Sequence, residues 1–273
     1  MCVVHFVVLV KGPRMTQRHF FLPSQLLILL LLLILLAGCG KKGPVRPLRQ
    51  QLPAAPQALA VQQKGTRFLV AWDLPRTNQD GSELTDLEGF RVFKMKYDLG
   101  QDCPECRDTS VLLLDVDLGY LRDVRRSGER LYLWDDELEP GFGYQYRIVP
   151  YNSKGREGEP VLLRLPFVTS PAAPGGLAAE GHDRMVRLRW QTATGVGAEV
   201  ELLGYNLYRR EGDEPFPFPP VNLEILTEPT FEDYGVENGR VYIYSVRTVT
   251  RIRGNTVESP LSATAEARPQ AGL

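Results

Sequence analysis

A repeated pattern of apolar and aromatic residues constrains the fold of this chain more than any other feature. Pro56 to Leu59 recurs as Pro174 to Leu177, and Trp72 recurs as Trp190, so one spacing of 118 residues (from 56 to 174 and from 72 to 190) links two separate matches. Two further matches follow at shorter spacings: Gly89-Phe90-Arg91-Val92-Phe93-Lys94 with Gly204-Tyr205-Asn206-Leu207-Tyr208-Arg209, and Tyr144-Gln145-Tyr146-Arg147-Ile148 with Tyr242-Ile243-Tyr244-Ser245-Val246. The chain therefore contains two copies of one structural unit, and the first copy has the longer middle.

Within each copy the apolar residues recur with a period of two, which is typical of half-buried β-strands. The alternating sets are Phe68, Val70 and Trp72; Val186, Leu188 and Trp190; Tyr144, Tyr146 and Ile148; and Tyr242, Tyr244 and Val246. Clusters of Gly, Pro and Asp separate these segments, and no convincing helical period lies between them. The pattern predicts an all-β protein built from two antiparallel β-sandwiches.

These motifs resemble the fibronectin type III domain, twice over. The shared features are Pro-x-x-Leu, a strand that ends in Trp, Gly-Phe/Tyr-x-Val/Leu-Phe/Tyr and Tyr-x-Tyr-x-Ile/Val. The resemblance implies two tandem immunoglobulin-like sandwiches, at 53–169 and 170–269, with Trp72 and Trp190 in their cores. It also implies that Tyr144 and Tyr242 form tyrosine corners, in which the hydroxyl bonds to the upstream backbone.

The two copies depart from the family pattern in different places. The first copy approaches its corner as Leu138-x-Pro140-x-x-x-Tyr144, as the family does, but it carries extra residues from Gly100 to Gly128. The second copy has Val236 at the position of Leu138, without the proline two residues later. These departures bear on loop lengths and leave the predicted fold unchanged.

The N-terminal segment ends its apolar run, Leu26 to Leu36, in Leu36-Ala37-Gly38-Cys39. Basic residues precede this run, and small residues stand before the cysteine, as at a signal-peptidase site. The segment resembles a bacterial lipoprotein signal sequence, with residues 1–38 as the signal peptide. A plain transmembrane anchor is the alternative, but the run is well short of the roughly 20 apolar residues that span a bilayer.

The lipoprotein resemblance implies that Cys39 carries a diacylglycerol on its thiol and an acyl chain such as palmitate on its amino group. Residues 39–52 are then a lipidated N-terminus and a proline-bearing tether. Gly40 after the cysteine resembles the sorting signal for the outer membrane, and translation can begin at Met1 or Met15. Cys39 to Pro44 also resembles the start of a short lipoprotein that assists maturation of the lipopolysaccharide translocon, which suggests an alternative role in envelope assembly.

Composition narrows the chemistry of the exported part. Removal of 38 residues leaves 29 Lys and Arg against 33 Asp and Glu, a net charge of −4, so nucleic acid is not an expected partner. His182 is the one histidine after Cys39, and it lies in a turn-like Gly-His-Asp sequence. Catalytic sites built on histidine and His-rich metal sites are therefore not expected. We expect no enzyme activity, no metal and no cofactor besides the lipid on Cys39.

Cys103-Pro104-Glu105-Cys106 is the sharpest local motif. In an exported protein two cysteines this close form a disulfide, which here closes a small loop. A redox pair or half of a zinc site are the alternatives. The first needs a helix N-terminus at the motif, and the second needs two more ligands.

Two segments are candidates for contact with other molecules. If Leu131 and Leu133 face the core, then Tyr132 and Trp134 point outward and form a possible contact surface for protein or sugar. Partial cover by the Gly100 to Gly128 insertion is the alternative. The proline-rich run Glu214 to Pro220 predicts an extended loop that either covers a sandwich edge or docks on a partner. The sequence thus predicts an envelope lipoprotein whose non-catalytic modules act as spacers or bind an unknown envelope protein or glycan.

Overall fold

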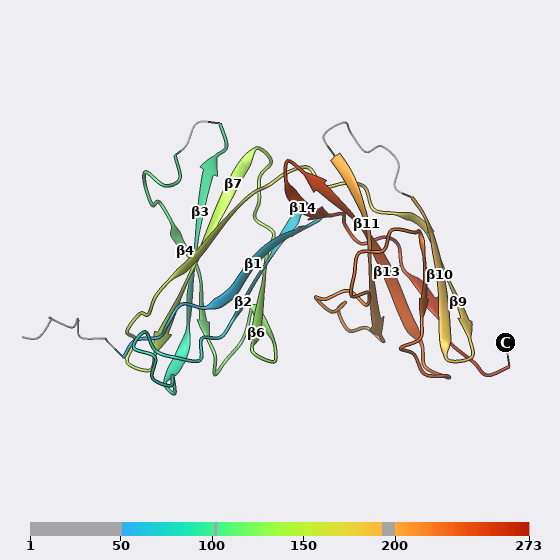
Figure 1. The fold of residues 1–273 in the computed structure, drawn as a ribbon, viewed down its shortest axis with the longest axis horizontal. Helices are drawn as coiled ribbons and strands as arrows, with labels where there is room; N and C mark the ends of the chain where they lie inside the picture. The colour runs from blue at the N-terminus through green and yellow to red at the C-terminus, as the bar shows by residue number, and fades with distance from the viewer. Residues whose placement is uncertain (1–50, 101–102, 193–199, 273) are drawn as a thin grey trace, which may run out of the picture. The chain divides into compact units, whose positions relative to one another are not determined.

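The computed structural model describes residues 51–100, 103–192 and 200–272. The signal peptide and the lipid-attachment motif of Leu36, Ala37, Gly38 and Cys39 lie outside these residues. Every regular element within the described ranges is a β-strand (Figure 1). None of the described residues forms a helix that is long and apolar enough to cross a membrane.

The first sandwich has two four-stranded layers. One layer has the order β1 (Gln57–Lys64), β2 (Arg67–Asp73), β6 (Arg130–Asp135) and β5 (Val124–Ser127). The other has the order β4 (Val111–Asp117), β3 (Leu87–Asp98), β7 (Phe142–Asn152) and β8 (Val161–Pro166). All pairs within these layers are antiparallel. The insertion that includes Gly100 to Gly128 supplies β4 and β5, so the extra residues extend both layers.

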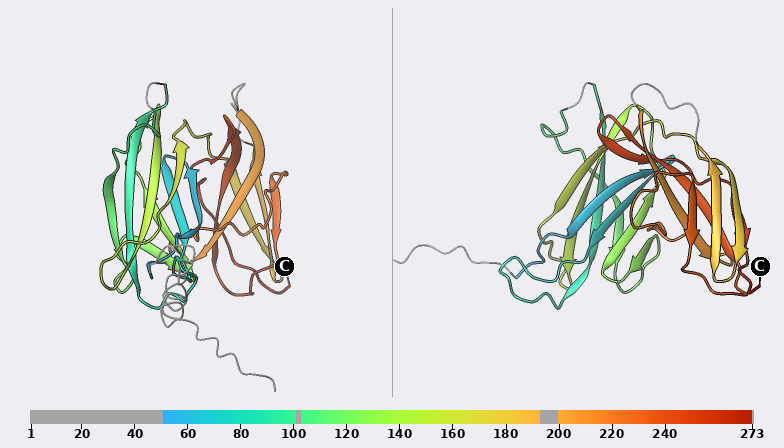
Figure 2. Two further views of the ribbon diagram at one scale, coloured as in Figure 1. Left: turned by 60° about the vertical axis from the view of Figure 1, so that its left-hand side comes forward. Right: turned by 45° about the vertical axis from the view of Figure 1, so that its right-hand side comes forward.

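The second sandwich repeats this two-layered plan (Figure 2). One layer has the order β12 (Thr230–Asp233), β10 (Met185–Gln191) and β9 (Gly175–His182). In the other, β13 (Tyr242–Ile252) pairs with β11 (Val200–Glu211), β14 (Asn255–Glu258) and β15 (Ala265–Ala267). The prediction of two tandem β-sandwiches is therefore confirmed.

Each sandwich encloses its own hydrophobic core, and the two cores are built alike. Trp72 packs edge-to-face on Phe90, with ring centroids 5.7 Å apart, and Trp190 packs on Tyr205 in the same way at 5.4 Å. Successive strand residues point to opposite faces, so the period of two in the sequence places one residue of each pair inside. These buried aromatic rings supply much of the stabilising apolar burial.

Both tyrosine corners are present. The backbone N–H of Glu139 donates to the hydroxyl of Tyr144 at 2.7 Å, and that of Glu237 donates to the hydroxyl of Tyr242 at 2.9 Å. Each tyrosine thereby ties the loop before its strand to the edge of the core. The donor lies five residues upstream in both copies, although only the first copy has the proline.

Both copies also share a buried aspartate that ends one strand and is paired with a tyrosine and a basic residue. Asp135 accepts a hydrogen bond from the hydroxyl of Tyr146. It also forms an ion pair with Lys94, whose Nζ lies 2.7 Å from Asp135 Oδ2. In the second copy Asp233 does the same. The hydroxyl of Tyr244 donates to its Oδ2 at 3.0 Å, and Arg209 Nη1 lies 2.6 Å from that oxygen. Because each carboxylate is almost fully buried, removing its partners would leave an unpaired charge in the core.

The two sandwiches are joined by backbone pairing as well as by the chain. Strand β1 of the first pairs in parallel with β14 of the second, with Gln63 opposite Val257 and Lys64 opposite Glu258 (Figure 1). This pairing makes one continuous sheet that passes through both sandwiches. Within the first sandwich, Nε2 of the buried Gln63 donates to the carbonyl of Val168 at 2.6 Å and fixes this end of β1.

Candidate interaction surface

The outward face of β6 carries the two aromatic residues that the sequence marked. Leu131 and Leu133 are buried in the core, whereas Tyr132 and Trp134 lie on the opposite face and are half-buried. Strand β2 lies beside them, with Leu69 opposite Trp134 and Ala71 opposite Tyr132. The alternation therefore places both rings as expected, outside the core.

Two other side chains cover part of this aromatic face. The ring of Phe218 stacks on Tyr132 with centroids 4.2 Å apart and planes 6° from parallel, and it lies 6.2 Å from Trp134. The guanidinium of Arg67 lies over the Trp134 ring at 4.2 Å. We call Arg67, Tyr132, Trp134 and Phe218 the aromatic cluster. Cover thus comes from Arg67 and Phe218, while the insertion contributes β5, whose Arg125 pairs opposite Tyr132.

Phe218 belongs to the proline-rich segment 214–220, which we call the proline strap. The residues after the strap are bonded to the free side of β11. Val221 N donates to Leu207 O at 2.7 Å, and Tyr205 and Leu226 exchange two backbone bonds at 2.8 and 3.0 Å. Edge cover of the second sandwich therefore comes from residues 221–226, which follow the strap, whereas the strap itself carries Phe218 to Tyr132 of the first sandwich.

The buried side chain of Asn222 holds this segment in place. Its Oδ1 accepts from Leu207 N at 2.8 Å, and its Nδ2 donates to the carbonyl of Glu224 at 2.7 Å and to Asn206 Oδ1 at 3.0 Å. The carbonyl oxygen and both N–H donors of this asparagine are therefore engaged. The strap itself is mostly exposed, because only Phe216, Phe218 and Pro220 are half-buried.

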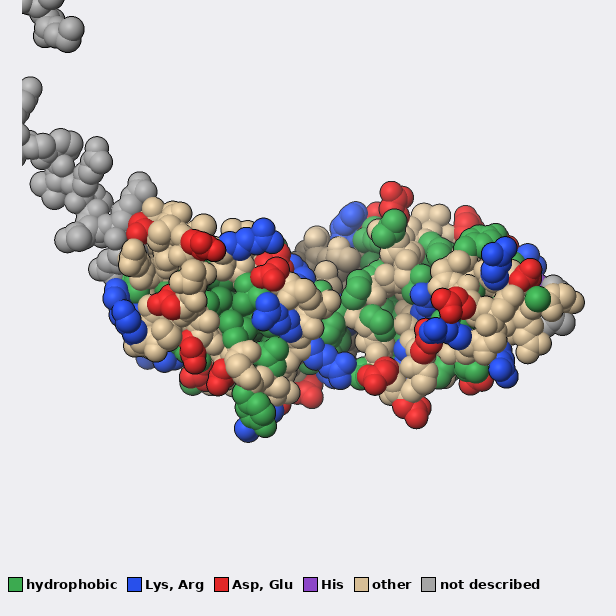
Figure 3. Space-filling view, turned by 90° about the horizontal axis from the view of Figure 1, so that it is seen from below, with side chains coloured by type: hydrophobic (Ala, Val, Ile, Leu, Met, Phe, Trp, Pro, Cys, Tyr) green, Lys and Arg blue, Asp and Glu red, His purple; other side chains and the backbone are tan. Residues whose placement is uncertain are grey.

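A groove of about 250 Å³ lies beside the aromatic cluster, between the strap and the sheet of the first sandwich. Polar residues from both sandwiches line it, including Gln62, Lys64, Arg130, Asn206 and Glu258. On the face drawn in Figure 3, Lys and Arg side chains alternate with Asp and Glu and with apolar side chains. Such a mixed surface suits specific contact with a protein or a sugar better than attraction to a polyanion.

Three residues that line this groove, Lys64, Asn206 and Glu258, belong to a buried network of charges. Lys64 Nζ lies 2.9 Å from Glu258 Oε1 and donates to the hydroxyl of Tyr208 at 2.7 Å. That hydroxyl donates to Glu258 Oε2 at 2.7 Å, and Asn206 Nδ2 donates to Oε1 at 2.9 Å. Arg247 approaches from the other side, with Nε 3.6 Å from Oε2. Both oxygens of Glu258 are thus occupied, and the network ties β1 to β11, β13 and β14.

Burial changes the proton affinities in this network. Loss of hydration lowers the pKa of Lys64, and the neighbouring Glu258 opposes that change. Loss of hydration likewise lowers the pKa of Arg247. The pKa of Tyr208 is raised, first by burial and then by the charge of Glu258. Because the charged groups bond to one another, the arrangement is suited to holding the two sandwiches together.

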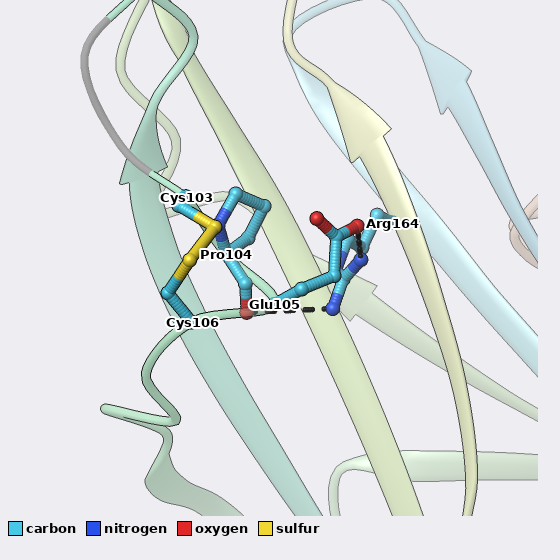
Figure 4. The surroundings of a disulfide bond; sticks show 5 residues. All are labelled: Cys103, Pro104, Glu105, Cys106 and Arg164. Atoms are coloured by element: carbon cyan, nitrogen blue, oxygen red, sulfur yellow. Dashed lines mark hydrogen bonds and ion pairs between the residues drawn. A yellow bond between two sulfur atoms is a disulfide. The ribbon is translucent and has the colours of Figure 1, made fainter.

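Cys103 and Cys106 are joined by a disulfide in an exposed loop after β3 (Figure 4). Glu105, inside the four-residue loop, pairs with Arg164 of β8 at 2.5 Å. The carbonyl of Pro104 accepts from the same guanidinium at 3.4 Å. Arg164 also donates to Gln145 on β7 at 2.7 Å, so the loop is fastened to the neighbouring strands.

Other expected positions lie apart from these features. His182 ends β9, and its Nε2 lies 4.0 Å from Glu180. Within residues 51–100, 103–192 and 200–272, no group of three or more His, Cys, Asp and Glu side chains could hold a metal ion.

Sequence reasoning missed Lys64, Glu258 and Phe218. The sequence carries no local signal for the first two, which lie 194 residues apart. The proline-rich run around Phe218 indicated that this segment could dock on another surface. It did not indicate that Phe218 would stack on Tyr132 of the same chain.

No protein-family model matches the chain, and no curated protein matches it either. Among solved structures, an Fn3-like protein from Clostridium thermocellum is 28% identical over 38% of this chain and 97% of that chain, with a TM-score of 0.30. The FN1–FN3 domains of chicken CNTN1 are 15% identical over 81% of this chain and 68% of that chain, with a TM-score of 0.27. The two layers of each sandwich, the paired tryptophan cores and both tyrosine corners give this chain a fibronectin type III-like fold.

Proposed function

We propose that this chain is a bacterial envelope lipoprotein that presents two non-catalytic β-sandwich modules for contact with another envelope component. The observation that carries this proposal is the order of its parts. A Leu36-Ala37-Gly38-Cys39 motif ends a short apolar run, a proline-bearing tether follows, and the strands after it build two sandwiches. Lipid on Cys39 would hold the modules at a membrane, because several acyl chains together bind firmly.

The proposed parts are a signal peptide at 1–38, a lipidated tether at 39–52, and modules at 53–169 and 170–269. Gly40 favours the outer membrane as the site of attachment. Both cores are filled by aromatic and aliphatic side chains, which is expected of modules that act through their surfaces.

The aromatic cluster is the proposed contact surface. Trp, Tyr and Arg are the residues that most often dominate binding energy at protein interfaces, and aromatic rings also stack on sugars. Trp134 and Tyr132 are half-exposed, and Arg67 beside them is exposed. The unidentified partner is therefore an envelope protein or glycan that binds across β2 and β6.

The anchor is tested by changing Cys39 to Ser in the full chain and measuring its partition between membrane and soluble fractions. Loss of the protein from the membrane fraction, together with loss of labelling by a palmitate analogue, is expected. A double change of Cys103 and Cys106 to Ser is the matched control and should leave partition unchanged. Retention of the Cys39→Ser protein in membranes would contradict lipid anchoring and favour the apolar run as the anchor.

The contact surface is tested by proximity labelling in living cells with the full chain, with and without Trp134→Ala. A specific neighbour that is lost with Trp134→Ala supports the aromatic cluster. Tyr234→Ala changes another exposed aromatic residue, in the second sandwich, and should leave the neighbours unchanged. An identical set of neighbours in all three proteins would reject the surface. If residues 1–52 alone then restored the phenotype of a deletion strain, envelope assembly through the segment after Cys39 would replace it.

A further inference from the structure

Strand β4 ends its sheet with an edge that the described residues leave open. It pairs with β3 on one side, and within residues 51–100, 103–192 and 200–272 no strand pairs with its other side (Figure 1). A free edge presents a row of backbone donors and acceptors to any extended chain of suitable shape. We propose that β4 pairs antiparallel with β4 of a second copy of this chain.

The first step is the exposure of apolar side chains along β4. Val111 and Leu112 are 66% and 52% exposed. A bulge at Leu113 is the cause, because Leu112 lies opposite Phe93 and Leu114 opposite Val92, so Leu113 is an extra residue. Leu113 and Leu114 both pack against the core, whereas Leu112 does not. The first half of β4 therefore exposes two apolar side chains, those of Val111 and Leu112.

The second step is a groove beside the other half of the same strand. It has a volume of about 280 Å³ and is lined by residues 114–117 and 120–124. Its apolar walls come from Leu114, Val116, Leu121 and Val124, and its charged walls come from Asp115, Asp117, Arg122 and Asp123. Tyr120 stands 66% exposed among the lining residues. The groove lies between β4 and β5, which are the terminal strands of the two layers on this side of the sandwich.

An antiparallel pair of β4 strands matches these two halves to each other. A two-fold axis near Leu114 places Val111 and Leu112 of each copy beside the second half of the partner strand, where the groove lies. Such a contact is self-complementary, as a two-fold interface must be. It also separates the carboxylates of Asp115 and Asp117 from those of the other copy, whereas a parallel pair would set like charges side by side.

The other edges of the first sandwich are less suited to this pairing. Strand β8 carries Arg164, which is engaged by the disulfide loop, and it ends at Pro166. Strand β5 has only four residues, and two of them are exposed arginines, Arg125 and Arg126. Charge, proline and short length are the features that keep edges unpaired. Strand β4 has seven residues and no proline, and its two charged residues, Asp115 and Asp117, both lie in its second half.

The interface predicted here is small. Seven paired residues span about 24 Å at roughly 3.4 Å per residue, and their contact lies at the lower end of the sizes of specific interfaces. The dimer should therefore be weak in dilute solution and should form where the chain is concentrated, as on a membrane surface. The pairing itself does not depend on the lipid.

The test is site-specific photo-cross-linking in the full chain. With p-benzoylphenylalanine at Val111, irradiation of living cells should give an adduct of twice the chain mass. The same group at Leu162, a 50% exposed residue of β8, should not. Addition of Leu112→Glu should lower the adduct from Val111 at least tenfold, since it adds a carboxylate to a contact that Asp115 and Asp117 of the partner strand already line. Leu162→Glu is the matched control and should leave the yield unchanged.

Each other outcome overturns the proposal. Absence of a doubled mass from Val111, or equal adducts from Val111 and Leu162, would exclude specific pairing of β4. An adduct of any other mass would identify a different protein as the partner of this edge. Leu112 is exposed, so Leu112→Glu should fold normally, and an unchanged melting temperature separates loss of pairing from loss of structure.

Discussion

The two sandwiches share their internal construction and differ in how their edges end. Both bury a tryptophan against an aromatic ring, both have a tyrosine corner, and both pair a buried aspartate with a tyrosine and a cation. At the edges, β11 of the second sandwich is covered by its own chain after the proline strap. The first sandwich instead adds β4, and the outer side of β4 lacks a partner strand in the described part of the chain.

This difference shows which positions are free to diverge between copies of one fold. A core residue must fill a fixed space and satisfy fixed partners, so both copies keep the same residue types at equivalent places. An edge strand only has to avoid unwanted pairing. A covering segment, charged side chains or pairing with a specific partner strand can each prevent it. The surfaces that distinguish this chain are therefore expected at β4, at the proline strap and at the aromatic cluster.

The largest expected effects test the shared core. Trp72→Ala and Trp190→Ala should each lower the free energy of unfolding by about 3–5 kcal/mol, because each removes a large buried ring and leaves a cavity. Both are almost fully buried. Denaturant titration of the full chain measures the loss. A cost below about 1 kcal/mol in one copy only would break the claim that the two cores are equivalent.

The next effect concerns the junction between the sandwiches, by which we mean the buried network of Lys64, Glu258 and Arg247. Glu258→Gln should cost about 3 kcal/mol, because it leaves Lys64 and Arg247 buried without a counter-charge. Glu201→Gln removes an exposed pair with Arg251 and should cost no more than about 0.5 kcal/mol. Calorimetry of the two variants makes the comparison. If they melt alike, the junction contributes no more than a surface ion pair.

The same network predicts a dependence on pH. Burial holds the pKa of Lys64 below its unfolded value of 10.5, so between the two values the unfolded chain binds the extra proton. Stability contributed by this group therefore rises with pH up to about that value. Lys64→Met should remove this part of the slope of unfolding free energy against pH. Equal slopes in both proteins would show that Lys64 titrates normally.

A smaller effect compares the tyrosine corners. Tyr144→Phe and Tyr242→Phe should each cost about 1–2 kcal/mol, because each leaves a backbone N–H of the preceding loop without its acceptor. Unfolding of each variant in urea provides the measurement. Equal losses would show that Pro140, present only in the first copy, is not needed for the corner, and a loss confined to Tyr144→Phe would show that it is.

The parts of the fold that the sequence predicted depend on local patterns. The spacing of Trp72 and Trp190 and the period of two along β2, β7, β10 and β13 can be seen within single segments of chain. The outward direction of Tyr132 and Trp134 followed from the same alternation, because Leu131 and Leu133 had to face the core.

The junction could not be predicted, because its members lie far apart in the sequence and have ordinary residue types. Lys64 and Glu258 look like solvated charges in their own segments, and only the parallel pairing of β1 with β14 brings them together. The insertion was expected as a loop, and its strands were missed because the bulge at Leu113 interrupts the alternation along β4. Contacts between distant surfaces depend on packing that no local pattern encodes.

The smallest predicted effect tests whether the strap truly belongs to both sandwiches. Phe218→Ala should cost about 1 kcal/mol by removing the stacked ring on Tyr132, whereas Phe216→Ala, which faces Arg210 of its own sandwich, should cost less. The two variants would differ little in the free energy of unfolding, but they should differ in the quenching of tryptophan fluorescence. Of the three tryptophans, Trp72 and Trp190 are buried, so iodide quenching reports mainly on Trp134. Quenching should rise with Phe218→Ala and stay unchanged with Phe216→Ala. If neither variant changes it, Phe218 does not cover the aromatic cluster in solution, and the face across β2 and β6 is open to the proposed partner without displacement of the strap.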